Sequence, residues 1–522
     1  MKHLCSWTLG LALLAAAAPL SAQQGLDAVV ERTRAEFHVP GIAVGIVKDG
    51  QLVFAKGYGV RKLGAPEPVT PRTLFGIASN TKAFTSAALA MLVDEGKLKW
   101  DDRVVDRLPG FQMSDAYVTR EMRIRDLLCH RSGLGLGAGD LMFFPASDLS
   151  AEQILYRLRY IPLATSFRSA YAYDNILYNV AGAVIQQISG KSWAQFIEER
   201  FFTPLGMTGS KTSIRLVGPA DDVAAPHSMD EGKLRPVKAT ELDNLAPAGS
   251  IVSSVEDLSK WVIALLNQGE LGGGKRLFSA RQARELWAPA TILPIGDYPP
   301  MLAELKPHFS DYALGETLRD YRGHLIVTHA GGLQGVVTKI TMLPELKLGI
   351  IVLTNQEEEN AYEAIQWTII DHYLNAPRKD WVAAFVEARK QERADAAHAV
   401  AEAGAKRNAQ SRPSLPLGAY AGRFRDPWYG DVAIEKSGDG LTIRFTHSPK
   451  LTGRLEHWQY DTFIARWDDR TQMADAYVTF ALNPNGGIAQ VKMMAVSPLT
   501  DFSFDFHDLA LTPVAEDAPA WD

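Results

Sequence analysis

Hydrophobic and polar positions follow two different periods along residues 26–374. Apolar residues recur at helical spacing in residues 26–38, 79–95 and 361–374. Residues 41–61 instead form two β-rich runs joined by Asp49-Gly50, which predicts a hairpin with a tight turn. Further strands are predicted over residues 325–327, 335–342 and 348–353. Residues 114–315 mix helical runs with Gly- and Pro-rich loops.

The pattern changes in the last third of the chain. Residues 378–412 are rich in Ala, Glu, Lys and Arg, which predicts a surface helix or semi-rigid linker. From Gly418 onward the period is two, as at Leu441, Ile443 and Phe445, and again at Phe502, Phe504 and Phe506. Turn sequences at residues 437–440 and 483–487 separate the runs. Short strands divided by such turns predict a small all-β barrel or sandwich.

The first 22 residues have the features of a secretory signal peptide. Lys2 precedes a short apolar run over residues 7–19, and Leu20-Ser21-Ala22 ends in a small residue suited to a signal peptidase. The run is too short for a membrane span, and no later stretch is long and apolar enough for one. We therefore expect a secreted or periplasmic protein with a signal peptide (1–22), a first globular domain (23–376), a helical linker (377–417) and a barrel domain (418–522).

Composition argues against nucleic-acid binding, an intrachain disulfide and a metal site. The formal net charge is −6 and basic residues form no block, so nucleic acid is not an expected partner. Cys5 lies in the predicted signal peptide, which leaves Cys129 alone and allows no intrachain disulfide. The histidines show no metal-ligand spacing, and we expect neither a metal nor a cofactor.

A serine and a lysine three residues apart begin the helix predicted over residues 79–95. The stretch reads Ser79-Asn80-Thr81-Lys82, and positions i and i+3 share one helix face. The Lys82 amine can therefore reach the Ser79 hydroxyl and take its proton, which a weakly nucleophilic serine needs. Taken alone, this serine also fits a helix N-cap and this lysine a solvated surface residue.

Two further motifs follow in order. Tyr173-Asp174-Asn175 offers a phenol that can shuttle a proton and an amide that can orient a substrate amide. His329-Ala330-Gly331-Gly332 follows a predicted strand, and glycines at a strand edge let a substrate backbone lie close. The backbone amides of Ser79 and Gly332 are candidates for an oxyanion hole. The candidate catalytic residues are Ser79, Lys82 and Tyr173, and the candidate substrate-binding residues are Asn175, His329, Gly331 and Gly332.

Together these motifs resemble S-x-x-K, Y-x-N and H-x-G of the serine hydrolases that share a fold with class C β-lactamases and D-alanyl-D-alanine carboxypeptidases. Residues 124–134, 202–207 and 247–254 are also similar to that family, so the resemblance covers residues 26–374. It implies an α/β fold of the β-lactamase/transpeptidase type, with an antiparallel sheet flanked by helices plus a helical region. It also implies that Ser79 forms an acyl-enzyme, that Lys82 and Tyr173 share the base role, and that Asn175 holds the substrate amide.

The third motif departs from the β-lactamase pattern. Class C β-lactamases carry a lysine where this chain has His329, and that lysine faces the β-lactam carboxylate. A near-neutral histidine is a weaker anchor, and histidine here looks more like D,D-carboxypeptidases, D-aminopeptidases and some esterases. Residues 420–424, 429–430 and 455–458 resemble a lipocalin-like domain appended to some of these peptidases. Arg168, whose Phe167-Arg168 pair resembles the same subgroup, is expected to close the loop bearing Tyr173 through an ion pair.

The sequence thus predicts an exported serine hydrolase acting on a small peptide, amide or ester, preferably a D-amino-acid-containing or cell-wall-derived peptide. An esterase or weak β-lactamase using the same site is one alternative, and a non-catalytic sensor of penicillin or peptides is another. A third alternative makes the C-terminal barrel the functional part. The balance between Lys82 and Tyr173, the acyl and leaving groups, and the oligomeric state stay open.

Overall fold

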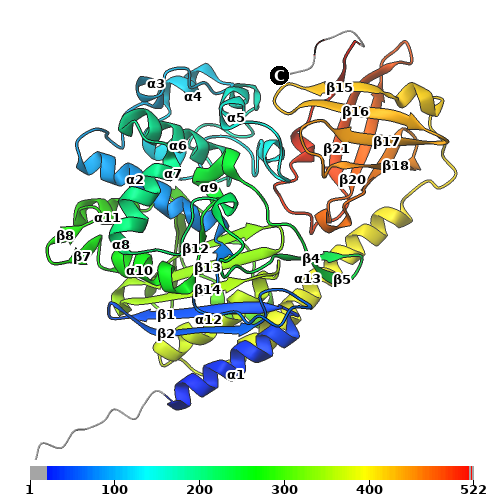
Figure 1. The fold of residues 1–522 in the computed structure, drawn as a ribbon. Helices are drawn as coiled ribbons and strands as arrows, with labels where there is room; N and C mark the ends of the chain where they lie inside the picture. The colour runs from blue at the N-terminus through cyan, green and yellow to red at the C-terminus, as the bar shows by residue number, and fades with distance from the viewer. Residues whose placement is uncertain (1–19, 516–518, 520–522) are drawn as a thin grey trace, which may run out of the picture.

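The computed structural model describes residues 20–515 and 519. A sheet-and-helix domain and a C-terminal barrel are joined by a long helix (Figure 1). The predicted signal peptide lies outside the described residues except for its last three, which begin helix α1 (Leu20–Glu36). This helix starts six residues before the one predicted over residues 26–38.

An eight-stranded antiparallel sheet forms the centre of the first domain. Its order is β2-β1-β14-β13-β12-β11-β10-β9. The bounds are β1 (Gly41–Lys48), β2 (Gln51–Gly59), β9 (Thr291–Ile292), β10 (Ser310–Tyr312), β11 (Thr317–Tyr321), β12 (His324–Leu333), β13 (Val336–Leu343) and β14 (Leu348–Thr354). The predicted hairpin is confirmed as β1 and β2, with Asp49 and Gly50 both at positive φ in the turn. The three strands predicted near residues 325–353 are confirmed as β12, β13 and β14.

Helices cover both faces of the sheet because both faces are apolar. Ile42, Val44 and Ile46 of β1 pack in one core with α1, α12 (Glu359–Tyr373) and the start of α13 (Trp381–Ala405). Ala43 and Val47 point the other way, into the core shared with α10 (Val255–Leu266) and the helical region. Alternate side chains of one strand therefore join two separate cores.

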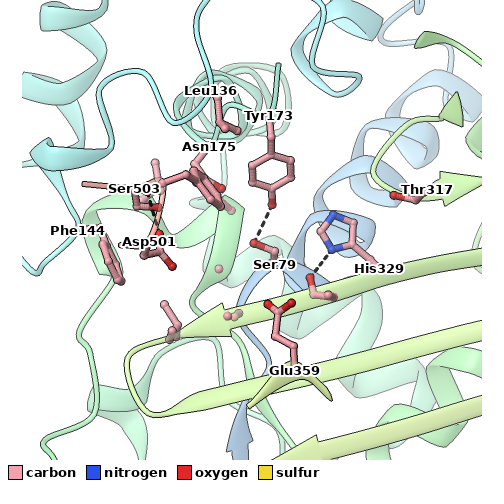
Figure 2. A pocket seen from close by; sticks show the side chains of 18 of the residues that line it. Ser79, Leu136, Phe144, Tyr173, Asn175, Thr317, His329, Glu359, Asp501 and Ser503 are labelled. Carbon is pink, nitrogen blue, oxygen red and sulfur yellow. Dashed lines mark hydrogen bonds between the residues drawn. The ribbon is translucent and has the colours of Figure 1, made fainter. Parts of the chain in front are cut away.

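The helical region surrounds α2 (Thr81–Asp94), whose residues from Thr81 to Val93 are all buried. Ser79 lies just before α2 in a 3-10 turn (Ala78–Asn80), not inside the α-helix that we expected from residue 79 (Figure 2). The other helices are α3 (Val104–Arg107), α4 (Ala116–Glu121), α5 (Ala151–Arg157), α6 (Ile176–Ser189), α7 (Trp193–Ile197), α8 (Thr203–Leu205), α9 (Ala246–Gly249) and α11 (Ala280–Leu286). Three small two-stranded sheets are β3 (Phe75–Gly76) with β6 (Val252–Ser253), β4 (His227–Asp230) with β5 (Lys233–Pro236), and β7 (Glu270–Gly272) with β8 (Lys275–Arg276). Within residues 20–515, every helix is too short or too polar to cross a membrane.

The C-terminal domain is an antiparallel barrel of eight strands. They are β15 (Gly422–Asp426), β16 (Gly430–Ser437), β17 (Gly440–Phe445), β18 (Thr452–Gln459), β19 (Thr462–Trp467), β20 (Ala476–Leu482), β21 (Ile488–Ala495) and β22 (Thr512–Pro513). β22 pairs with β15, and the neighbouring Leu511 bridges to Val491 of β21, so the ring nearly closes. Buried aromatic side chains such as Phe445, Trp467 and Phe506 pack against one another in its interior. The interior is therefore a packed core.

The strand predicted over residues 502–506 is wrong. These residues form a turn and loop that lead into a 3-10 turn (Phe506–Asp508). The Asp501 carboxylate accepts the Ser503 backbone N–H at 2.8 Å, and Asp505 accepts N–H groups from the first domain, Gly139 at 2.7 Å and Leu141 at 3.1 Å. Because carboxylates take up these N–H groups, the segment bends and reaches the first domain instead of extending the barrel.

Other contacts fix the barrel against the first domain. Arg157 of α5 is buried in the interface and donates to the carbonyl oxygens of Trp428 and Tyr429. Gln334, at the β12–β13 turn, donates to Thr471 Oγ1 (2.8 Å) and accepts from Lys450 (2.5 Å). Satisfied polar groups at a buried interface hold the two domains in one relative position.

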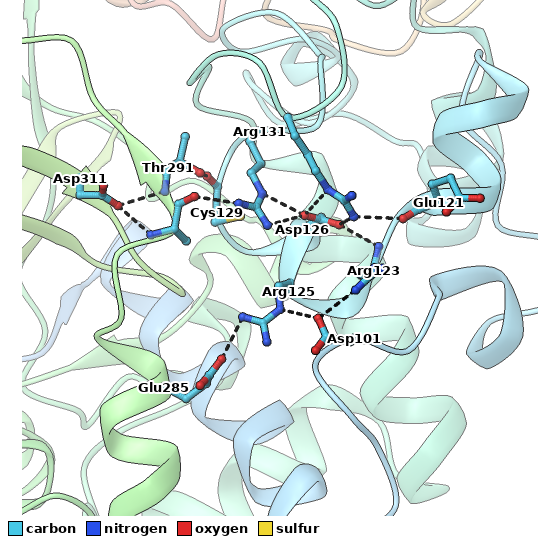
Figure 3. A network of polar contacts seen from close by, with 12 residues as sticks. Asp101, Glu121, Arg123, Arg125, Asp126, Cys129, Arg131, Glu285, Thr291 and Asp311 are labelled. Carbon is cyan, nitrogen blue, oxygen red and sulfur yellow. Dashed lines mark hydrogen bonds and ion pairs between the residues drawn. The ribbon is translucent and has the colours of Figure 1, made fainter.

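A buried carboxylate, that of Asp126, holds the loop that carries Tyr173. Figure 3 shows Asp126 within its network of polar contacts. The Asp126 side chain is fully buried and accepts from Arg131 Nε (2.9 Å), Arg168 Nη2 (2.5 Å) and the Arg123 backbone N–H (3.0 Å). The ion pair predicted for Arg168 is therefore confirmed. It links the loop before Tyr173 to the 3-10 turn Ile124–Leu127.

Asp126→Asn should lower the free energy of unfolding by about 3 kcal/mol, because two guanidinium groups lose their buried partner. Urea denaturation measures this difference. Asp101→Asn is the matched control, since Asp101 also pairs with two arginines but its side chain is 61% exposed; that variant should lose about 0.5 kcal/mol. Equal losses in the two variants would contradict a buried, loop-fixing role for Asp126.

Candidate active site

Ser79 lies on a turn that is hydrogen-bonded to strand β13 of the central sheet. Ala78 has a φ of 48°, which a residue with a side chain seldom adopts. Asn80 Nδ2 donates to Thr338 Oγ1 of β13 at 2.9 Å, and the same hydroxyl donates to the Ile77 carbonyl at 3.0 Å. These bonds fix the turn where the sheet meets the helical region, so the Ser79 hydroxyl has a defined position.

Lys82 is fully buried and its amine faces three acceptors. Nζ lies 2.9 Å from Ser79 Oγ, 2.7 Å from Asn175 Oδ1 and 3.1 Å from the Ala248 carbonyl oxygen. A neutral amine has two N–H groups and one lone pair. When Asn175 and Ala248 take the two N–H groups, the lone pair faces Ser79, and Lys82 can accept the serine proton.

Burial also makes that neutral form accessible. It lowers the pKa of Lys82 to about 7, although the buried carboxyl groups of Asp140 and Asp174 act in the opposite direction. A general base is most effective when its pKa lies near the working pH. The amine therefore combines the required position with a suitable pKa.

Tyr173 approaches Ser79 from the other side. Its hydroxyl lies 2.9 Å from Ser79 Oγ, and the Lys82 amine lies 4.9 Å from the centre of its ring. Burial raises the pKa of Tyr173 well above 10. The phenol therefore stays protonated near neutral pH, where it can donate a proton more readily than accept one.

Asn175 lies between the amine and a buried carboxyl group. Its Oδ1 accepts from Lys82, and its Nδ2 donates to Asp140 Oδ2 at 2.9 Å. Both ends of the amide thus have protein partners, and the residue also lines the cavity described below. Its expected role in holding a substrate amide stays a prediction.

His329 is buried in β12, and both ring nitrogens are engaged. Nδ1 lies 2.5 Å from the Ala330 carbonyl oxygen, which can only accept, so this nitrogen carries the hydrogen. Nε2 then accepts from the Tyr312 hydroxyl at 2.9 Å. Burial, assisted by the nearby Lys82 amine, lowers the pKa of His329 to about 3. The ring is neutral at physiological pH and offers no positive charge to a substrate carboxylate.

The two glycines after His329 have different surroundings. A Cβ at Gly331 would lie 2.2 Å from the Ile77 carbonyl oxygen, so only glycine lets β12 pack against the Ser79 turn. A Cβ at Gly332 would meet nothing within 4 Å. The pairing of β11 with β12 ends at Thr317–Thr328, so the strand edge beyond it is open to a bound chain.

A cavity of about 460 Å³ opens over these groups (Figure 2). Ser79, Tyr173, His329 and Gly332 line this cavity. Its walls include Leu136, Phe143 and Phe144 from the first domain and Asp501, Phe502 and Ser503 from the barrel domain. The structure thus brings all the candidate residues together. Gly331 lies close to the Ile77 carbonyl oxygen, beside the turn that carries Ser79.

The contribution of the barrel was missed by sequence reasoning. Phe502 packs edge-on against the Tyr173 ring, with ring centres 5.8 Å apart, and its carbonyl oxygen lies close behind Gly137. The period-two phenylalanines were interpreted as a strand, and no local pattern indicated that this segment reaches the first domain. Asp140 was missed because its only signal is its position in the fold.

His130 supports Tyr173 from behind. The two rings are 4.3 Å apart, and His130 Nδ1 accepts the Asp174 backbone N–H at 3.1 Å. Burial lowers the pKa of His130 well below its usual value, so the ring is neutral. Among the described residues, no group of three or more His, Cys, Asp or Glu side chains is arranged to hold a metal ion.

Comparison with known proteins places this chain in a family. A family model described as Beta-lactamase matches residues 26–375, and a second, described as a domain of unknown function (DUF3471), matches residues 406–513. The second description assigns no activity, so the likeness of the barrel to lipocalins stays a prediction.

Relatives of known name cover most of the chain. The unguisins hydrolase ungD′ of Aspergillus campestris is 30% identical over 444 residues, which is 79% of this chain and 77% of the relative. Protein flp of Staphylococcus aureus is 27% identical over 355 residues, 67% of each protein.

Solved structures agree in fold. The octameric penicillin-binding protein homologue from Pyrococcus abyssi superposes with a TM-score of 0.59 at 22% identity, covering 91% of this chain and 98% of that one. SurE superposes with a TM-score of 0.55 at 20% identity, covering 95% of this chain and 99% of its own. Since the Beta-lactamase model matches most of the chain and a hydrolase relative is 30% identical over most of its length, this protein belongs to the β-lactamase family.

Proposed function

We propose that this protein is an exported serine hydrolase that cleaves amide or ester bonds through an acyl-enzyme on Ser79. The observation that carries the proposal is the pair of contacts on one hydroxyl, where Lys82 Nζ and Tyr173 OH each lie 2.9 Å from Ser79 Oγ. A nucleophile with a base on one side and a proton donor on the other suits acyl transfer. Export rests on the signal-like character of residues 1–22.

In acylation, Lys82 acts first as the base, Ser79 then attacks the substrate, and Tyr173 last protonates the leaving group. Lys82 takes the Ser79 proton, Oγ forms a bond to the substrate carbonyl carbon, and the carbonyl electron pair moves to its oxygen. The backbone amides of Ser79 and Gly332 are our candidates for stabilising that oxyanion. When it collapses, the bond to the leaving group breaks. Tyr173 donates its proton to the departing nitrogen or oxygen and regains one from Lys82.

Deacylation repeats these steps with water. Lys82 takes a proton from water, whose oxygen bonds to the acyl carbon, and the bond to Ser79 Oγ breaks. The proton returns to Ser79 through Tyr173 or Lys82, and the acid product leaves. Every proton that the site accepts is thereby returned within one cycle.

A D-amino-acid-containing peptide is the preferred substrate class. Neutral His329 offers no charge to the carboxylate of a β-lactam, which argues against a primary β-lactamase. The open edge of β12 suits an extended backbone. The structural relative SurE has been solved with D-Leu, and the Aspergillus relative is named for hydrolysis of unguisins.

A fluorophosphonate probe should label the wild type, and Ser79→Ala should abolish labelling. Ester hydrolysis should fall by at least about 10³-fold, because the variant lacks the nucleophile. Gel fluorescence and mass spectrometry of the labelled peptide provide the readout. Ser437→Ala, at the exposed end of β16, is the control and should behave as the wild type. Full activity in Ser79→Ala would exclude the mechanism.

The pH profile of kcat/KM for a neutral ester distinguishes the two candidate bases. Protonated Lys82 cannot accept a proton, and its pKa is about 7. Activity should therefore rise with pH to a plateau, with its midpoint near pH 7 and about a tenfold fall per pH unit well below it. Lys82→Arg should be inactive throughout, because arginine stays protonated. A rate that still climbs above pH 9 would assign the base to Tyr173 instead.

Substrate class follows from a matched panel of D- and L-aminoacyl amides, the corresponding esters and a chromogenic β-lactam. We expect the D-aminoacyl amides to give higher kcat/KM than their L counterparts and the β-lactam to be a poor substrate. Ester turnover without D-preference would favour the esterase alternative. A β-lactam adduct that persists, without turnover of any substrate, would favour the sensor alternative.

A further inference from the structure

The barrel domain reaches the proposed base through a chain of hydrogen bonds. Ser503 Oγ donates to Asp140 Oδ2 at 2.9 Å, and Asn175 Nδ2 donates to the same oxygen at 2.9 Å. Asn175 Oδ1 in turn accepts from Lys82 at 2.7 Å. Ser503 and Asp140 are both buried, with 8% and 0% of their surface exposed. Three successive hydrogen bonds thus connect Ser503, which is distant in sequence, to the Lys82 amine.

The barrel also holds the backbone on both sides of Asp140. Asp505 is fully buried and accepts the N–H groups of Gly139 (2.7 Å) and Leu141 (3.1 Å). Phe504 packs edge-on against Phe144 in the same segment, with ring centres 5.4 Å apart. Both the position of Asp140 and the direction of its side chain therefore depend on the barrel.

The donor and acceptor directions of these hydrogen bonds fix the orientation of the Asn175 amide. Asp140 Oδ2 receives two donors, so it acts as an acceptor whether or not Oδ1 carries a proton. An acceptor at that point requires Asn175 to present its nitrogen to Asp140 and hence its oxygen to Lys82. A flipped amide would place an NH₂ group against the amine, where it would compete with Ser79 for the lone pair.

We propose that Ser503 is a positioning residue for the reaction, which orients the Asn175 amide through Asp140 and so keeps the Lys82 lone pair on Ser79. The inference rests on the proposed function and adds a role for the barrel in it. Ser503 touches neither the reacting atoms nor the amine. It acts through the two residues between.

Other titratable groups surround the hydrogen-bonded series from Ser503 to Lys82 and influence the protonation of Asp140 and Lys82. Lys82, Asp501 and Asp505 interact with Asp140, and Asp174, Tyr173, Tyr178, His130 and His329 surround the amine. Burial raises the pKa of Asp140 to about 8, and the bonds from Asn175 and Ser503 oppose that rise. Loss of the Ser503 donor would raise the Asp140 pKa further. The amine would then have less negative charge nearby, and its own pKa would fall.

Ser503→Ala in the full-length protein tests the proposal. We expect kcat for a short neutral ester to fall about tenfold, since one hydrogen bond to the buried Asp140 carboxyl group is lost, with little change in KM. The midpoint of the acid limb of kcat/KM should move to lower pH. Ser503→Thr keeps the hydroxyl and should restore both, and Ser437→Ala should change neither. Asp140→Leu has a similar size but carries no hydrogen-bond acceptor, and it should lose more activity than Ser503→Ala.

The outcomes separate this inference from the function on which it rests. Absence of fluorophosphonate labelling at Ser79 in the wild type would refute the proposed function itself. Normal labelling with an unchanged kcat and acid limb in Ser503→Ala would overturn the positioning role alone. A lower melting temperature without movement of the acid limb, and without rescue by Ser503→Thr, would show that Ser503 only packs the interface. That result would also overturn the proposal.

Discussion

Burial of one amine sets the properties of this site. Lys82 lies on α2, a helix buried along nearly its whole length, and its Nζ has Ser79, Asn175 and the Ala248 carbonyl oxygen as hydrogen-bond partners. A charged ammonium in such surroundings is costly unless it is paired. The two nearby carboxyl groups, Asp140 and Asp174, are themselves buried and have raised pKa values. The neutral amine is therefore within reach near pH 7, and a neutral amine is what a serine nucleophile requires.

The neighbours of the amine follow from the same constraint. His130 and His329 are held neutral by burial and by the nearby amine, while burial keeps the Tyr173 phenol protonated. Each of these groups can then donate or accept a hydrogen bond without adding charge to a small volume. The site contains several titratable side chains, yet the proposed mechanism moves only one proton among Ser79, Lys82 and Tyr173.

Sequence reasoning located the candidate site because its residues are close together or ordered along the chain. Ser79 and Lys82 are three residues apart, so helical geometry alone predicted their contact, even though the serine lies on a 3-10 turn. The hairpin and the later strands also followed from short-range patterns. Asp140 and Ser503 are 363 residues apart, and no periodicity encodes such a contact. Apolar and polar residues alternate from Phe502 to Phe506 as they would in a strand. The segment forms a turn and loop instead, because the carboxylates of Asp501 and Asp505 accept backbone N–H groups.

The two domains divide the work at the cavity. The first domain supplies the proposed nucleophile, the proposed base and the strand edge, and it is the domain that matches the Beta-lactamase family model. The second supplies Asp501, Phe502 and Ser503 as one wall. Because this wall also holds Asp140, changes in the barrel segment alter the shape of the cavity and the support of the base together. Substitutions that widen the cavity for a new substrate would then disturb the amine unless the Ser503 contact is kept. This coupling constrains how such a barrel can change the specificity of a β-lactamase-type domain.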